Sequence, residues 1–76
     1  MKTTVDLLKI GDKAIITHVD LDKIPLKLLE MGCLPDNELE IIQIAPLGDP
    51  ISIEVSGYHL SLRLSEADNI IVAPAN

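Results

Sequence analysis

The chain has 76 residues, enough for one small domain that buries roughly 60% of its unfolded surface, and this argues against a deep enzyme cleft. Hydrophobic residues make up 47% of it, with one Tyr and no Phe or Trp, so the core must consist of Leu, Ile and Val. Twelve acidic residues against six basic ones give a net charge of −6, which repels phosphate backbones and argues against nucleic acid as a partner.

The chain carries no signal for secretion or membrane insertion. Cys33 is the single cysteine, so no internal disulfide can form, and residues 1–20 hold charged side chains instead of a long apolar signal core. No run approaches the roughly 20 apolar residues of a spanning helix, and there is no basic amphipathic anchor. We therefore expect a cytoplasmic protein, without direct membrane insertion, that folds as a single domain over residues 1–76.

The first half of the chain predicts one strand followed by one helix. The β-rich segment over residues 13–19 predicts the first strand. Asp20 or Asp22 can accept the free N–H groups that open a helix, which we expect over residues 22–31. Gly32 then supplies the left-handed position that commonly ends a helix.

The next segment predicts a second strand and a break. Pro35 predicts a turn, after which the strand should begin near Glu38. Over residues 39–45 apolar side chains occupy both parities, as expected for a strand that is covered on both sides. The segment 46–50, with two prolines and a glycine, then interrupts the strand.

The last third of the chain predicts a hairpin and a closing strand. Around a turn at Ser56-Gly57, apolar residues alternate with polar ones, which indicates one buried face. The apolar set is Ile51, Ile53, Val55, Tyr58, Leu60, Leu62 and Leu64. A single helical turn over residues 65–68 and a strand over residues 69–73 should follow. Together these elements predict a mainly β fold, a small barrel of about five strands with one short α-helix between the first and second strands.

No residue pattern indicates catalysis, a cofactor or a metal site. There is no phosphate-binding loop, and no serine has a histidine partner marked in the sequence. His18 and His59 lack the HxxxH spacing of ligands, and His59 is expected to be solvated or paired across its hairpin. Cys33 is interpreted as a buried, small hydrophobic residue, with redox sensing as a minor alternative. We expect a protein that is not an enzyme and has no cofactor.

Several motifs occur together in a fixed order. They are Leu28-Leu29-Glu30-Met31-Gly32, Pro35, Glu38-Leu39-Glu40-Ile41, Ala45 to Pro50, Gly57-Tyr58 and Leu60-Ser61-Leu62-Arg63. In this respect the chain resembles the FeoA family, small proteins that accompany the FeoB ferrous iron transporter of bacteria, and the resemblance implies an SH3-like barrel. Many relatives have Gly after the turn proline where this chain has Asp36, a change that should leave the turn intact.

The resemblance also implies a function in bacterial ferrous iron uptake. It implies a cytosolic accessory or regulatory protein that contacts the cytoplasmic, GTPase-bearing part of FeoB; whether it activates, stabilises or assembles the transporter stays open. One alternative is a metal-responsive regulatory domain similar to the SH3-like domains of iron-dependent transcription regulators, although those follow a DNA-binding region. Ferrous iron delivery is a third hypothesis.

Loops are the expected contact surface, because they lie outside a rigid barrel. The candidate residues in the first loop are Pro46, Leu47, Asp49 and Pro50, with the alternative that Leu47 merely plugs the end of the barrel. Met31 and Leu34, at the end of the helix, form the second candidate surface. Exposed strand edges also predict weak self-association.

Overall fold

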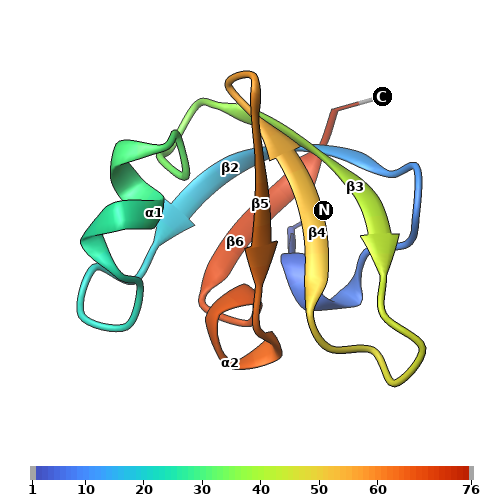
Figure 1. Ribbon diagram of the computed structural model, residues 1–76. Helices are drawn as coiled ribbons and strands as arrows, with labels where there is room; N and C mark the ends of the chain where they lie inside the picture. The colour runs from blue at the N-terminus through green and yellow to red at the C-terminus, as the bar shows by residue number, and fades with distance from the viewer. Residues whose placement is uncertain (1, 76) are drawn as a thin grey trace.

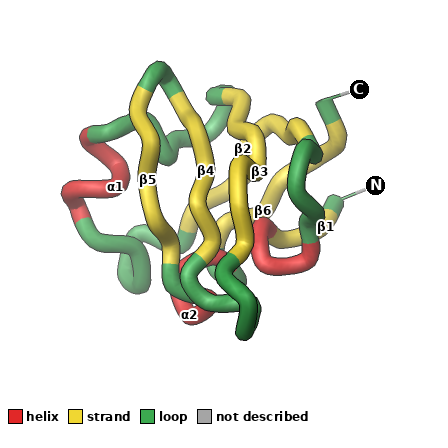
Figure 2. The backbone as a smooth tube through the Cα atoms, turned by 45° about the vertical axis from the view of Figure 1, so that its right-hand side comes forward, coloured by secondary structure: helices red, strands yellow, loops and turns green. Residues whose placement is uncertain are grey.

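The computed structural model describes residues 2–75, in which a six-stranded antiparallel sheet curves around an aliphatic core (Figures 1 and 2). The elements are β1 (Thr3–Thr4), η1 (Val5–Leu7), β2 (Lys13–Val19), α1 (Leu26–Glu30), β3 (Glu38–Ile44), β4 (Ile51–Val55), β5 (Tyr58–Leu62), α2 (Leu64–Ala67) and β6 (Ile70–Pro74). The strand order is β1-β6-β2-β3-β4-β5, so the curved sheet stays unclosed between β5 and β1. The mainly β prediction is confirmed, with one strand more than expected, because Thr3 and Thr4 pair with β6.

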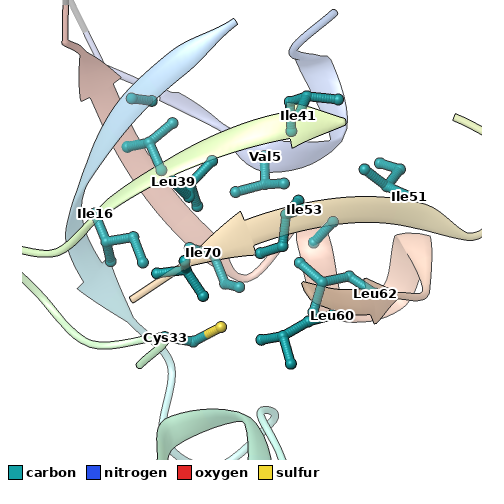
Figure 3. Close-up of a cluster of buried hydrophobic side chains, with 14 of the residues drawn as sticks. Val5, Ile16, Cys33, Leu39, Ile41, Ile51, Ile53, Leu60, Leu62 and Ile70 are labelled. Atoms are coloured by element: carbon teal, nitrogen blue, oxygen red, sulfur yellow. The ribbon is translucent and has the colours of Figure 1, made fainter. Parts of the chain in front are cut away.

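The core is aliphatic, as the composition requires, and each strand longer than two residues contributes to it (Figure 3). Its fully buried large side chains are Val5, Ile16, Leu39, Ile41, Ile51, Ile53, Val55, Leu62, Ile70 and Val72, together with Cys33. No polar or charged residue is buried within residues 2–75. Burial of these side chains therefore carries the stability of the fold, without a buried polar network to hold it.

The expectation that β3 is covered on both sides is wrong. Leu39 and Ile41 are buried, but Ile42 is 39% exposed. The register of β3 against β4 shifts between Ile41 and Gln43, which places a bulge there. The short helices lie at the ends of the sheet in Figure 1 and leave the outward face of β3 open to solvent.

The β4–β5 hairpin forms where the alternation predicts it, around a two-residue turn. Ser56 and Gly57 both have positive φ, 52° and 82°, as a type I′ turn requires. Two members of the predicted buried face are not buried. Tyr58 is 49% exposed because it directly follows the turn, and Leu64 is 37% exposed because it begins α2 rather than extending β5.

Helix α1 is shorter than predicted and neither aspartate caps it. Pro25 stands at its N-cap with ψ 142°, so the turn that starts at Asp20 cannot continue into the helix. Gly32 ends the helix with φ 110°, as expected, and its N–H donates to the Leu29 carbonyl while the Cys33 N–H donates to the Leu28 carbonyl. Within residues 2–75 the longest helix has only five residues, and none is long and apolar enough to cross a membrane.

Candidate functional site

The loop between β3 and β4 is closed by its own backbone. The Ala45 N–H donates to the Pro50 carbonyl over 3.1 Å, and the Gly48 N–H donates to the Ala45 carbonyl over 2.7 Å. Gly48 has φ 86°, a conformation that glycine adopts without strain. These two hydrogen bonds hold the backbone of residues 45–50 in one conformation at one end of the barrel.

Leu47 lies at the tip of this loop with 94% of its surface exposed. The alternative that it plugs the barrel is therefore ruled out, because a plugging side chain would be buried among the core residues. Pro46 and Pro50 are also exposed, and both belong to the same loop. The geometry presents an apolar side chain to solvent on a fixed backbone, the arrangement that costs least entropy on binding.

Asp49 is attached to the neighbouring helix. Its Oδ1 accepts a hydrogen bond from the Leu64 backbone N–H, the first of α2, over 3.1 Å. The carboxylate thus fixes the loop against α2 while remaining exposed. A structural role accounts for this aspartate in the isolated chain, and its second oxygen remains available to a partner.

The second candidate surface has a different character. Met31 is half-buried and packs against the core, whereas Leu34 is 42% exposed. In Figure 1, α1 and the turn after it lie on one side of the barrel, and the β3–β4 loop lies at the other. The structure therefore does not join the six candidate residues into one site. Two separate surfaces carry them.

The outward face of the sheet carries a groove that we did not predict from the sequence. A shallow groove of about 230 Å³ runs over β3, β4 and β5, with Ile42, Ser52 and Ser61 in its lining. On β5, His59 Nε2 lies 3.7 Å from Glu54 Oε1, which agrees with the expected cross-strand pairing. The polar parity of β4 and β5 is the signal that places these groups on one face.

In the part of the chain that the structure describes, the titratable side chains do not gather into a metal centre. Among residues 2–75, no three His, Cys, Asp or Glu side chains come together in a way that could hold an ion. Cys33 is fully buried, as predicted, and burial raises the pKa of its thiol to about 11, with a smaller contribution from the charge of Glu66. A neutral, inaccessible thiol is a poor ligand and a poor nucleophile, so the redox alternative loses its support.

The family model of the FeoA domain matches residues 3–74. The chain belongs to the FeoA family. It is 36% identical over 63 residues to the Fe(2+) transport protein A/Fe(2+) transporter FeoB fusion protein of Porphyromonas gingivalis. That match covers 82% of this chain, and the chain spans only 8% of the length of the fusion protein.

Solved structures of FeoA proteins share the fold. The solution structure of FeoA from Chlorobium tepidum has a TM-score of 0.86 at 31% identity, covering 97% of this chain and 71% of that one. Stenotrophomonas maltophilia FeoA, crystallised with zinc and described as a procaryotic SH3 domain protein, has a TM-score of 0.78 at 28% identity, with coverages of 93% and 89%. The SH3-like fold expected from the resemblance is thus confirmed.

A more distant likeness extends to the IdeR protein. The crystal structure of IdeR from T. acidophilum has a TM-score of 0.82 at 20% identity, covering 96% of this chain and 34% of that one. At this identity the likeness shows a shared fold alone, since one fold can support unrelated functions.

Proposed function

We propose that this FeoA-family chain acts in ferrous iron uptake as a non-enzymatic accessory protein of the cytoplasm, one that contacts the cytoplasmic part of an FeoB-type transporter. The P. gingivalis relative supports this proposal, because its name places transport protein A and transporter FeoB in one polypeptide. Joining two modules in one chain raises their effective concentration for each other, which is useful when they act in contact.

Leu47 is the single observation that carries the proposed contact surface. A leucine that is 94% exposed on a loop held by two backbone hydrogen bonds is ready to dock without reorganisation. Full burial of such a side chain contributes about 1.5 to 3 kcal/mol. Pro46 and Pro50 flank it and limit the freedom that docking would remove.

Charge complements this apolar contact. The chain carries a net charge of −6, and Asp49 stands two residues after Leu47 in the same loop. A basic rim on the partner would steer the encounter, so association should slow as ionic strength rises. The apolar tip would then set the lifetime of the complex.

The metal-responsive regulator remains the second candidate, and the likeness to IdeR adds only a shared fold to it. Such a regulator needs a DNA-reading element in addition to the barrel. The helices within residues 2–75 have three, five and four residues, too short for a recognition helix. The described part of the chain therefore favours the accessory role.

A pull-down of the detergent-solubilised transporter with this protein as bait tests the proposal. The variant Leu47→Asp should recover much less transporter than the wild type, while folding unchanged by circular dichroism. Leu21→Asp is the matched control, because Leu21 is 67% exposed in the turn before α1, a segment on the other side of the barrel from the β3–β4 loop (Figure 1). Equal recovery by both variants would reject the loop, and no recovery by the wild type would reject the contact itself.

The delivery hypothesis has its own measurement. Anaerobic dialysis against Fe(II) would reveal stoichiometric iron if the chain were a carrier. We expect no stoichiometric iron, since no cluster of three potential ligands occurs within residues 2–75. Bound iron at one equivalent would move delivery ahead of docking as the function.

A further inference from the structure

Strand β5 (Tyr58–Leu62) is the long free edge of the sheet. The strand order ends at β5 on one side and at β1 on the other, and β1 has only two residues against five in β5. In Figure 2, β5 lies outside β4 at one side of the curved sheet. One side of its backbone therefore pairs with no other strand of the sheet.

The turn geometry determines which backbone groups are free. In a hairpin with a two-residue turn, Val55 and Tyr58 exchange both hydrogen bonds, and so do alternate pairs beyond them. Leu60 and Leu62 therefore bond to β4, whereas the N–H and C=O groups of His59 and Ser61 point away from it. Within residues 2–75 these groups form no hydrogen bond to another segment.

This edge lacks the usual protection against pairing. Natural edge strands carry Lys or Pro, or a bulge that twists them away from other chains. The sequence of β5 has neither residue, and its register with β4 is unbroken, unlike that of β3 with β4. An edge of this kind is a template for another strand.

The charges beside the edge favour a basic occupant. The strand registers place Lys13, Glu40, Glu54 and His59 in one row across β2, β3, β4 and β5. Glu38, Glu40 and Glu54 line a shallow groove on this face together with Lys13, its single cation. A strand added to β5 would extend the row, and its residue opposite His59 would share the face of Glu54.

We propose that the β5 edge accepts an extended peptide segment of a protein partner as an additional strand, with a basic side chain opposite His59 and an apolar side chain opposite Leu60. Leu60 is 6% exposed and points into the core, so its counterpart would cover the open rim of the barrel. Arg63 follows β5 and has the same parity as His59 and Ser61. Its positive charge repels a basic residue at that end of the strand, so the basic residue belongs at the end near Tyr58. Two copies of this chain pair less well, because each carries a net charge of −6.

This mode of binding is independent of the contact through the β3–β4 loop. It uses main-chain hydrogen bonds for affinity and alternate side chains for selection, as in other cases of strand addition. Leu47 lies in the loop whose Asp49 accepts a hydrogen bond from the Leu64 N–H just beyond β5, so a partner could use either surface or both. Loss of one contact would leave the other measurable.

Amide exchange and NMR titration of the ¹⁵N-labelled protein with a synthetic peptide of alternating Arg and Val test the proposal. In the free protein, the His59 and Ser61 amides should exchange rapidly. With saturating peptide their exchange should slow about tenfold or more, while the amides already paired with β4 change little. An absence of slowing, or shifts concentrated elsewhere, would overturn the proposal. Protection that grows with protein concentration without peptide would also overturn it, in favour of a second copy.

Two matched probes separate strand addition from charge attraction alone. The same peptide methylated on alternate backbone nitrogens keeps its charge, and we expect it to lose the protection at His59 and Ser61. Ser61→Pro removes an N–H that points away from β4 without removing a bond to β4, and it should weaken the binding of the peptide. Glu54→Gln removes a negative charge beside the added strand, and it should also weaken the binding of this basic peptide. Equal binding of the methylated peptide would reject strand addition even if the Ser61→Pro variant failed to fold.

Discussion

Gly32 lies directly against Ser56, so that the end of α1 touches the turn of the β4–β5 hairpin. A Cβ on Gly32 would come within 2.6 Å of Ser56 Oγ and 2.8 Å of Ser56 Cβ, closer than real side chains approach. Gly32 also has φ 110°. The contact joins the only helix between β2 and β3 within the described residues to the far end of the sheet.

We predict that Gly32→Ala lowers the free energy of unfolding by about 2 to 4 kcal/mol, because it combines backbone strain with a clash. Gly11→Ala is the matched control. Gly11 has φ 90°, but its added Cβ would meet nothing within 4 Å, so it should lose only about 1 kcal/mol from strain. Urea unfolding of both variants gives the difference, which measures the contact with Ser56.

The double variant Gly32→Ala with Ser56→Gly checks the origin of that difference. Removal of both Ser56 side-chain atoms opens the space that the new methyl group needs. The two substitutions should therefore be coupled favourably by about 1 kcal/mol or more. Additive losses would show that backbone strain alone, and not the contact, makes Gly32 sensitive.

Asp49 offers a second test, at the candidate loop. Asp49→Ala removes the acceptor of the Leu64 N–H and should lower the free energy of unfolding by about 0.5 to 1.5 kcal/mol. Asp49→Asn keeps a side-chain oxygen at the same place and should lose less. Thermal unfolding of the two variants measures this. If Asn were as destabilising as Ala, the hydrogen bond would not be the stabilising interaction.

The turns of this chain could be predicted from its sequence because each depends on local chemistry. Gly32, Gly57 and Gly48 all take positive φ where the sequence places a helix end or a turn. The two hairpin strands β4 and β5 followed from alternation of apolar residues with period two. The start of α1 could not be predicted in this way, since Asp20 and Pro25 both suit a helix start and only the observed ψ of Pro25 decides between them.

The candidate surface was only partly predictable, because exposure depends on contacts between distant segments. Leu47 and Met31 are both apolar residues beside a turn, yet one is almost fully exposed and the other packs on the core. The free side of β5 is a property of the strand order, which local patterns do not determine. Sequence reasoning therefore named the loop, and it expected exposed strand edges without identifying β5 as the strand that carries the long one.

Leu62 and Leu47 allow a buried and an exposed leucine to be compared by their contributions to the free energy of unfolding. Leu62→Ala should lower the free energy of unfolding by about 2 to 4 kcal/mol, because Leu62 is fully buried. Leu47→Ala, the same chemical change at a side chain that is 94% exposed, should change stability by less than about 0.5 kcal/mol. Urea titration compares them. A similar loss for Leu47→Ala would mean that this loop packs in solution and cannot present a free contact.

The buried thiol makes stability depend on alkaline pH. The pKa of Cys33 is about 11 in the fold against 9.0 for a free thiol, so above pH 9 the unfolded chain loses its proton first. Stability is then fully present below pH 9 and decreases as pH rises toward 11, by about 2 to 3 kcal/mol in total. The effect of this thiol must be isolated from every other effect of alkaline pH on the chain.

Cys33→Ala provides that isolation. The variant lacks the thiol proton but keeps every other titrating group, so the free energy of unfolding should decrease less steeply between pH 9 and pH 11 than in the wild type. It should be less stable than the wild type at neutral pH, because it leaves a small cavity in the core. The two pH curves, measured by urea unfolding under reducing conditions, should therefore converge as pH rises. Parallel curves would mean that the thiol ionises equally easily in the folded and unfolded chains, and would contradict a raised pKa for Cys33 in the fold.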